Sequence, residues 1–200
     1  MSGESPAPSG PEYLVEGLSV DRLEAQFISD QVSIIDFGES NEMHSPPKDL
    51  EITASFRSPE LLFDNTIGVG CDLWALACTI YEVRARSPLF ENFMDEDDEV
   101  IMQMVPLLGK LPEPWWGSWK ARVNPDTGKP YMLISTLEEL LSGSSSSGDD
   151  PEGKKNEAGG FVVQIEESKV VGNLLRGILK YDPKERLSVE AVLEHSWFKR

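Results

Sequence analysis

The stretch CDLWALACTIYEV, residues 71–83, decides the fold of this chain. Apolar residues occupy nearly every side of the helix that this stretch predicts. A helix at a protein surface carries one apolar stripe, so a helix that is apolar all round is expected to be buried within its domain. We therefore predict a central helix over about residues 70–84, around which the rest of the domain packs.

The end of the chain carries a second helical pattern. Val170, Leu174 and Ile178 lie at helical spacing, and Ser168 is a candidate N-cap for the helix that they predict. Ser188 is predicted to cap a last short helix in the same way. Both patterns extend the mainly α character that the central stretch indicates.

The N-terminal side has a different pattern. Residues 32–35, VSII, form a short apolar run that ends in a turn, and such a run predicts a β-strand. Residues 1–12, rich in Pro, Gly, Ser and Glu, are expected to form a disordered tail. Residues 142–160, SGSSSSGDDPEGKKNEAGG, are expected to form a low-complexity surface loop. The predicted fold class is mainly α, with one short β segment before Asp36.

Composition narrows the classes of function. With 200 residues, 40% hydrophobic and 26% charged, the chain is typical of one globular domain. Its net charge of −17 argues against nucleic acids and anionic membranes as partners and favours basic peptides. No apolar run approaches the roughly 20 residues that span a bilayer. Cys71 and Cys78 are predicted to lie on one helix about 10 Å apart, which is too far for a disulfide, so a reduced, intracellular protein is expected.

Four segments follow one another in a recognisable order. They are VSIIDFGES at 32–40, FRSPELLF at 56–63, CDLWALACTIYE at 71–82 and DPKERLSVEAVLEHSWF at 182–198. Their order and spacing resemble the C-terminal lobe of a eukaryotic protein kinase. Within that family they look most like the serine/threonine group that contains the SR-protein kinases and the cyclin-dependent kinases. The resemblance covers residues 32–200 and implies a kinase domain over residues 13–200 that is present only as its C-lobe part, with the N-lobe absent.

The resemblance implies a nucleotide site at the first motif. Asp36 matches the family's metal-binding Asp, whose carboxylate holds Mg²⁺ against the nucleotide phosphates. Phe37 matches the residue that packs under a helix of the other lobe, and Gly38 lets the backbone turn. ATP and Mg²⁺ are therefore the implied cofactors.

The resemblance also implies structural roles along an activation segment at residues 36–60. Glu60 is expected to pair with Arg186 of the DPKER motif in a buried carboxylate–guanidinium pair. Thr53 matches the Thr that braces the catalytic Asp in serine/threonine kinases, and Arg57 matches the Arg that marks this kinase group. Asp72 matches a buried Asp that holds the catalytic-loop backbone, although an acid in a first helical turn has the same position.

An acidic run precedes a further predicted helix. It stands where SR-protein kinases border a docking groove for Arg/Ser-rich peptides, and it equally suits a solvated helix cap. Both interpretations remain open from the sequence. The residues concerned are Asp95, Glu96, Asp97, Asp98 and Glu99.

Several residues that phosphoryl transfer requires have no counterpart in this sequence. A Gly-rich loop, a phosphate-binding Lys and a catalytic-loop Asp and Asn are needed. The histidines, His44 and His195, do not begin a His-Arg-Asp loop, so no catalytic base is assigned. Two hypotheses follow. The chain belongs to a serine/threonine kinase and is truncated and inactive alone, or it is a non-catalytic kinase-like module that binds basic peptides. A protein substrate and a cytoplasmic or nuclear location are expected.

Overall fold

The computed structural model describes residues 29, 31–48, 50–121, 136–141 and 165–199. It divides into two compact units, Met1–Gly38 and Glu39–Arg200. The predicted tail at residues 1–12 and the predicted loop at residues 142–160 lie outside the described residues.

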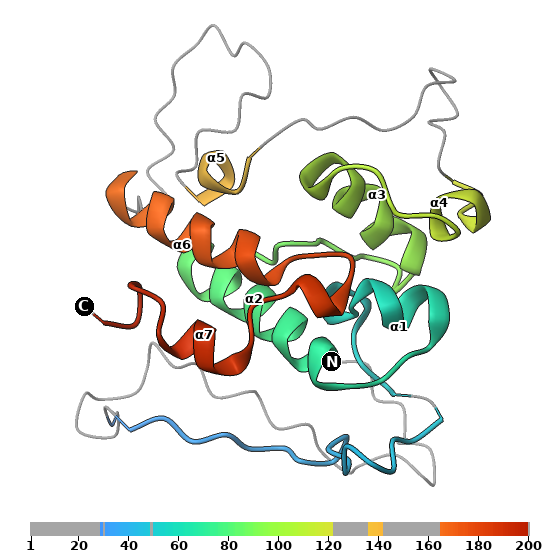
Figure 1. Ribbon diagram of the computed structural model, residues 1–200, viewed down its shortest axis with the longest axis horizontal. Coiled ribbons are helices and arrows are strands. Elements are labelled where there is room, and N and C mark those ends of the chain that lie inside the picture. Colours follow the sequence, from blue (N-terminus) through green and yellow to red (C-terminus); the bar gives the residue numbers. More distant parts are fainter. Residues whose placement is uncertain (1–28, 30, 49, 122–135, 142–164, 200) are drawn as a thin grey trace, which may run out of the picture. The chain divides into compact units, whose positions relative to one another are not determined.

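All regular secondary structure in the described part of the unit Glu39–Arg200 is helical, as the predicted mainly α class requires. Figure 1 labels the α-helices in chain order, and two single 3-10 turns accompany them. The elements are η3 (Ala54–Phe56), α1 (Pro59–Asp64), α2 (Val69–Ala85), α3 (Asp97–Leu108), α4 (Trp115–Ser118), α5 (Leu137–Leu141), α6 (Ile165–Ile178), η4 (Pro183–Glu185) and α7 (Val189–Leu193). None of the helices in the described ranges has the length and apolar character that a membrane span requires.

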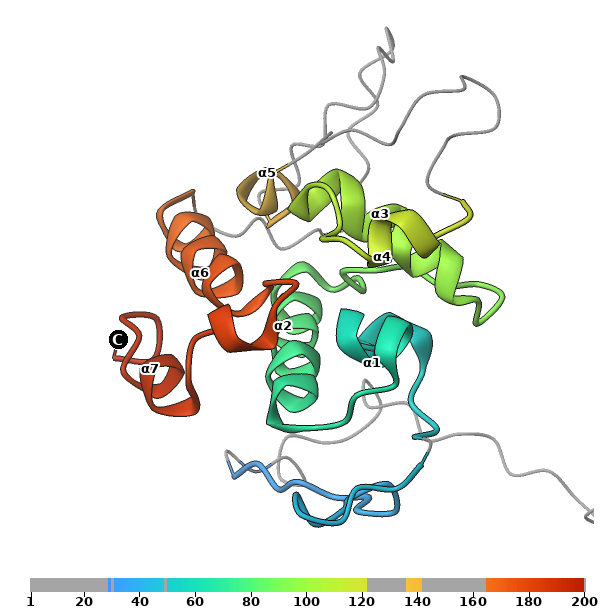
Figure 2. The ribbon, with the colours of Figure 1, turned by 45° about the vertical axis from the view of Figure 1, so that its right-hand side comes forward.

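The predicted central helix is α2, whose bounds differ by one residue at each end from those expected. It packs against α5, α6, η3 and η4, so it forms the centre of this unit, and Figure 2 shows it between α1 and α6. One prediction about α2 is wrong, since the helix is not buried on every side. Asp72, Leu76, Thr79 and Val83 are exposed on one side of it. An apolar sequence predicts burial only where a neighbouring element covers that side, and here the side faces solvent.

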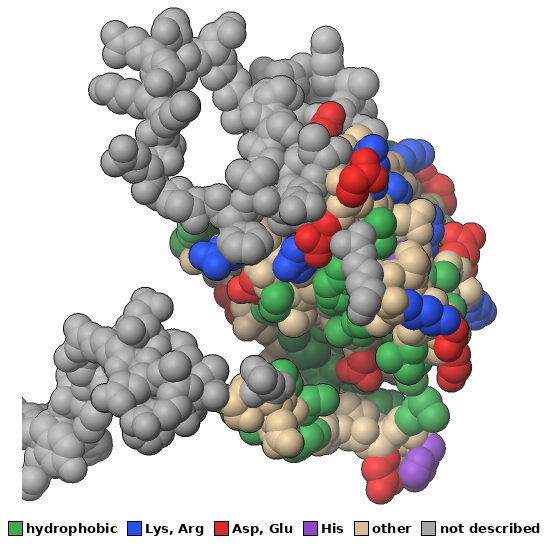
Figure 3. All heavy atoms as spheres, turned by 90° about the vertical axis from the view of Figure 1, so that its left-hand side faces the viewer, with side chains coloured by type: hydrophobic (Ala, Val, Ile, Leu, Met, Phe, Trp, Pro, Cys, Tyr) green, Lys and Arg blue, Asp and Glu red, His purple; other side chains and the backbone are tan. Residues whose placement is uncertain are grey.

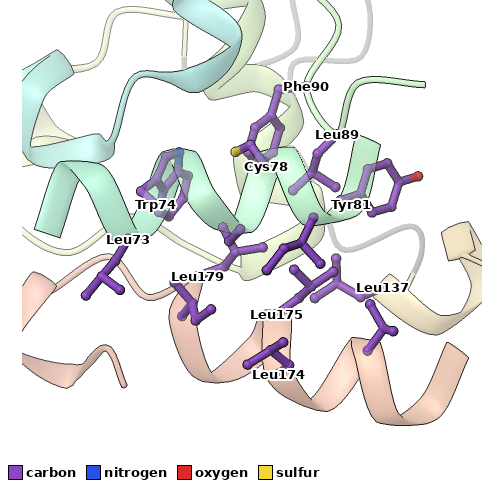
Figure 4. Close-up of a cluster of buried hydrophobic side chains, with 14 of the residues drawn as sticks. Leu73, Trp74, Cys78, Tyr81, Leu89, Phe90, Leu137, Leu174, Leu175 and Leu179 are labelled. Carbon is purple, nitrogen blue, oxygen red and sulfur yellow. The ribbon is translucent and has the colours of Figure 1, made fainter. Parts of the chain in front are cut away.

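The main core lies where α2 meets α6 and the segment that follows α2. Trp74 and Phe90 are both 0% exposed and their rings stack, with centroids 5.9 Å apart. Figure 4 shows Trp74 and Cys78 of α2 beside Phe90, with Leu175 of α6 in the same buried cluster. A smaller cluster contains Ile101 and Val105 of α3 together with Trp119. The apolar spacing that predicted these helices therefore also identifies the residues that hold them together.

The predicted caps have different outcomes. Ser188 caps α7 as expected, because its Oγ accepts a hydrogen bond from the Ala191 backbone N–H at 3.2 Å. Ser168 is not an N-cap, since α6 begins three residues earlier and places Ser168 inside the helix, where it is 2% exposed. The acidic residues Glu166 and Glu167 occupy the first turn instead and complement the helix dipole.

The unit Met1–Gly38 lacks the strand predicted before Asp36. Residues 31–36 have no regular secondary structure, and Val32, Ile34 and Ile35 are 79–94% exposed. A β-strand requires a neighbouring strand for its backbone hydrogen bonds. The described residues contain no such neighbour, so the short apolar run has no ladder partner and forms no strand.

Candidate functional site

The Glu60–Arg186 pair joins two motifs that lie 126 residues apart in the chain. Arg186 donates from Nη1 to Glu60 Oε1 at 2.7 Å and from Nη2 to Glu60 Oε2 at 2.6 Å. The two residues are 5% and 7% exposed, respectively for Glu60 and Arg186. Two parallel hydrogen bonds between opposite charges form the strongest kind of side-chain pair. The predicted pairing of these two residues is present in the structure.

Further contacts fix the Arg186 guanidinium from other sides. Its Nη1 also donates to the Gly70 carbonyl at 2.7 Å, and its Nε donates to the Lys180 carbonyl at 3.0 Å. The guanidinium lies 5.2 Å from the centroid of the Trp74 ring, a position that favours a cation–π interaction. Arg186 therefore connects the first turns of α1 and α2 with the segment after α6.

Two residues beside this pair were not identified from the sequence. A Cβ on Gly70 would lie 2.8 Å from the Pro183 Cβ and 3.0 Å from Glu60 Oε1, so only glycine fits there. Cys71 Sγ accepts from Ser58 Oγ at 3.2 Å and lies 3.8 Å from Glu60 Oε1. Burial raises the pKa of the Cys71 thiol and keeps it protonated beside the carboxylate. Gly70 lies in the first turn of α2, and its place in the sequence gives no signal of the side chains that approach it.

Arg57 connects the segment before α1 to the start of α3. Its Nε donates to the Ile52 carbonyl at 2.7 Å, and its Nη1 donates to Asp97 Oδ1 at 2.7 Å. Asp95 lies on the same side, with its Oδ2 3.7 Å from Arg57 Nη2, and accepts from the Ala54 backbone N–H at 3.1 Å. Asp95 has a φ of 55°, in the left-handed region that short polar residues tolerate. Two residues of the acidic run thus bind Arg57 and the η3 backbone.

The rest of the acidic run also makes contacts within the protein. Asp98 Oδ1 accepts from the Trp119 indole N–H at 2.9 Å. Glu99 Oε2 accepts from the backbone N–H groups of Phe93 and Met94, at 2.9 and 3.2 Å. Glu96 occupies the N-cap position of α3, although its side chain forms no capping bond. These contacts give Asp98 and Glu99 structural roles within the fold, and docking of a peptide on the run stays a prediction.

Asp36, Phe37 and Gly38 lie at the end of the unit Met1–Gly38. All three are exposed, and Asp36 has a φ of 62°. A Cβ on Gly38 would approach Asp36 Oδ1 to 3.5 Å, an ordinary contact. The motif thus forms a turn that presents a carboxylate to solvent.

The donor set around Asp36 limits what it can hold. Nowhere in the described ranges do three or more His, Cys, Asp or Glu residues gather as a metal site. Mg²⁺ is commonly held by one or two carboxylates and completes its octahedron with water and substrate phosphates. Asp36 has the right chemistry for one such ligand, so a metal here would depend on the phosphates of a bound nucleotide.

Thr53 and Asp72 are both exposed. Thr53 is at the N-cap position of η3 without a capping side-chain bond, and its carbonyl accepts from the Phe56 N–H at 3.0 Å. Asp72 was expected to be buried and is not. It lies in the first turn of α2 and lines a groove of about 330 Å³ together with Leu50, Ile52 and Ile67. Burial of Asp72 requires a polypeptide segment in that groove, because no carboxylate is buried without donors. The bracing role of Thr53 and the loop-holding role of Asp72 remain predictions.

The comparison with protein-family models decides the family. The model described as "Protein kinase domain" matches residues 24–198. This chain belongs to the protein kinase domain family. The match contains the Glu60–Arg186 pair, Arg57 and Asp36, so the contacts described above lie within a kinase domain.

The individual relatives are named as cyclin-dependent, serine/threonine or dual specificity protein kinases. The chain is 30% identical over 173 residues to "Cyclin-dependent kinase G-2" of Oryza sativa subsp. indica, covering 84% of this chain and 22% of that protein. It is 30% identical over 152 residues to "Serine/threonine-protein kinase SKY1" of Saccharomyces cerevisiae, covering 74% and 19%. It is 24% identical over 187 residues to "Dual specificity protein kinase CLK2" of Homo sapiens, covering 94% and 36%. The chain thus spans between about a fifth and about a third of the length of these relatives.

Proposed function

We propose that this chain forms the C-terminal lobe of a serine/threonine protein kinase that transfers the γ-phosphoryl group of ATP to protein substrates. The observation that carries the proposal is the buried Glu60–Arg186 pair, within a chain that matches the kinase domain over residues 24–198. This pair joins the end of the activation segment to the DPKER motif. Loss of either partner would leave an uncompensated charge in the protein interior and would destabilise the fold.

The proposal assigns a role to each of four residues. Asp36 supplies a carboxylate for Mg²⁺, and the metal, when bound, neutralises charge on the nucleotide phosphates. Glu60 and Arg186 anchor the end of the activation segment to α2. Arg57 holds residues 52–57 against the start of α3 through Asp97. The C-terminal end of the activation segment, residues 52–60, is thereby held by two separate sets of contacts.

The proposed substrate class is basic, in particular Arg/Ser-rich protein segments. The support is the net charge of −17, which attracts basic chains at long range, and the kinship with kinases of the same group. Because Gly-rich loop, phosphate-binding Lys and catalytic-loop residues have no counterpart in this sequence, we propose that the chain is inactive alone. Sequencing the transcript upstream of Met1 tests whether the chain is part of a complete kinase. A Gly-rich loop and an Asp-x-x-x-x-Asn motif in frame support that proposal, whereas an in-frame stop codon directly upstream contradicts it. For the kinase as a whole we also propose a cytoplasmic or nuclear location.

A second candidate function is a non-catalytic module that holds basic peptides. The observation that favours it is the core in the described part of the unit Glu39–Arg200, which buries Trp74, Phe90 and Leu174 and whose members do not include the Asp36 motif. In that case the kinase fold supplies a surface, and nucleotide plays no part.

A thermal-shift experiment on the 200-residue chain separates the two functions. Melting is followed with Mg-ATP, with an Arg/Ser-rich peptide and with neither, for the wild type and for Asp36→Asn. The kinase proposal expects Mg-ATP to raise the melting temperature of the wild type and to leave Asp36→Asn unchanged. A shift caused by the peptide alone supports the module instead. Equal shifts of both proteins by Mg-ATP contradict the role of Asp36.

A further inference from the structure

Phe93 and Met94 are two adjacent large apolar residues that the structure leaves open to solvent. They lie in the segment between α2 and α3 and are 83% and 71% exposed. Scattered single apolar residues on a surface are ordinary, whereas adjacent ones form the beginning of a patch. On the face at the left-hand side of Figure 1, which Figure 3 shows, hydrophobic side chains are interspersed with acidic and basic ones. The pair Phe93 and Met94 differs from such a mixed surface because no charged residue separates the two side chains in the chain.

The backbone that carries these two side chains is held firmly. The Glu99 carboxylate accepts from both Phe93 N–H and Met94 N–H, at 2.9 and 3.2 Å. Just before them, Glu91 N–H donates to Gln103 Oε1 at 2.8 Å, and Gln103 Nε2 donates to the Glu91 carbonyl at 2.6 Å. The exposure of the two side chains therefore does not come from a loose segment.

The segment is also anchored at its beginning and at its end. Phe90 is 0% exposed and stacks on Trp74 of α2, and Val100 of α3 is 0% exposed. A loop that is already ordered loses little conformational entropy when it binds a partner. Aromatic residues and Met are enriched at protein interfaces, while isolated charges are depleted at their centres. Phe93 and Met94 therefore have the chemistry of an interface residue pair on an ordered backbone, and the two side chains together are called the docking knob.

Charge defines the rim of this surface. Residues 91–99 contain six acidic residues and no Lys or Arg. Arg57 lies against two of the six, Asp95 and Asp97, while Glu91 and Glu96 are exposed without a basic partner among the described ion pairs. A partner that covers Phe93 and Met94 must therefore bring positive charge to the edge of the contact.

We propose that Phe93 and Met94 form a docking knob for a polypeptide segment that combines apolar side chains with Lys or Arg. This segment differs from an Arg/Ser-rich substrate, which has no apolar side chains to cover the knob. The knob is built by the α2–α3 segment and by Glu99 and Gln103 of α3. It requires neither nucleotide nor Asp36, so it goes beyond the proposed function and does not depend on it.

The test measures peptide binding to the full 200-residue chain by calorimetry. The probes are a short synthetic peptide of alternating Leu and Lys, an Arg/Ser-rich peptide of equal net charge, and a Leu/Glu peptide. The variants are Phe93→Ser/Met94→Ser and the matched control Val83→Ser, which changes a residue that is likewise 71% exposed but lies on α2. Circular dichroism melts confirm that each variant is folded.

The proposal expects the Leu/Lys peptide to bind the wild type and Val83→Ser alike, and the Phe93→Ser/Met94→Ser protein about tenfold more weakly. The Arg/Ser-rich peptide should bind both variants and the wild type equally, and the Leu/Glu peptide should bind none. Equal binding of the Leu/Lys peptide to all three proteins overturns the proposal, as does equal weakening by Val83→Ser. Amide chemical-shift changes in the wild type give a second readout. They should include residues 91–99, and shifts confined to other residues also overturn it.

Discussion

At the scale of single residues, the Glu60–Arg186 pair depends most strongly on the identity of both side chains. The Arg186 side chain is 0% exposed and that of Glu60 is 6% exposed. A charge in that position is tolerated only because its partner and the Gly70 carbonyl replace water. Arg57 shows the opposite case, because its partners Asp95 and Asp97 are about half exposed or more and its ion pairs are screened by solvent.

Removing one partner of the buried pair should cost far more than removing a surface pair. Glu60→Ala and Arg186→Ala are each expected to lower the free energy of unfolding by about 3–5 kcal/mol, because an uncompensated charge stays buried. The double variant should cost less than the sum of the two. Urea denaturation followed by circular dichroism measures each value.

The exposed Glu166–Lys169 pair provides the control for that prediction. Its side chains are 85% and 62% exposed and its atoms are 3.5 Å apart. Replacing both by Ala should change the free energy of unfolding by no more than about 1 kcal/mol. Additive losses in the Glu60 and Arg186 cycle would show that the two residues act independently and would contradict their assignment as one unit.

At the scale of elements, α6 contains two glycines with different surroundings. A Cβ on Gly172 would meet the end of the Glu138 side chain, with Oε1 at 2.6 Å. A Cβ on Gly177 would meet Leu187 Cδ1 at 2.5 Å and Cγ at 2.9 Å. The Leu187 backbone N–H donates to the Gly177 carbonyl at 2.9 Å, so Leu187 is held close to the helix at that point. The flexible Glu138 side chain can turn towards solvent, whereas the Leu187 side chain cannot move away because its backbone is hydrogen-bonded to α6.

The two glycines should therefore respond differently to the same substitution. Gly177→Ala is expected to lower the free energy of unfolding by about 1–3 kcal/mol, because overpacking outweighs the gain in helix propensity. Gly172→Ala is expected to change it by less than about 1 kcal/mol, because the propensity gain of Ala offsets the displacement of Glu138 from Arg176. Chemical denaturation of both variants measures the difference. Equal decreases in the free energy of unfolding for both variants would show that the Leu187 contact does not determine which substitution α6 tolerates.

At the scale of the whole molecule, several buried groups keep their protons in the folded state. Burial raises the pKa of the Cys78 thiol to about 12. It also raises the pKa of Tyr81 and, above the ordinary range of a phenol, that of Tyr181. Tyr181 in addition donates its hydroxyl hydrogen to the Gly109 carbonyl at 2.7 Å. The core formed by α2, α3 and the segment after α6 thus depends on neutral groups.

Stability should fall at alkaline pH for this reason. Below about pH 7.5, a full unit under the usual thiol pKa of about 8.5, the Cys78 thiol is protonated in both states and causes little pH dependence. Between about pH 9 and its folded pKa of about 12, only the unfolded state loses the proton, and stability decreases as pH rises. Melting temperatures from pH 8 to 11 should therefore decline, and less steeply in Cys78→Ala than in the wild type. Identical slopes would indicate that ionisation of Cys78 does not oppose folding.

Particular residues show how far sequence reasoning reached. The central helix was predicted from its apolar pattern, and the Glu60–Arg186 pair from the resemblance, because helical spacing and ordered motifs are local signals. The strand before Asp36, burial on all sides of α2 and burial of Asp72 were wrong, because each depends on a neighbour that covers the segment. The close fit at Gly70 was missed, since a glycine in a sequence does not reveal which side chains approach it.

Sequence alone therefore determined the family, the mainly α class and the identity of the residues that form the buried pair. The tertiary structure decided which surfaces are open and which charges are engaged. It placed Asp95 and Asp97 on Arg57, some 40 residues away, and it left Phe93 and Met94 in solvent. The physical reason is range, because helix formation follows from spacing within a few residues, whereas exposure and ion pairing depend on segments that only folding brings together.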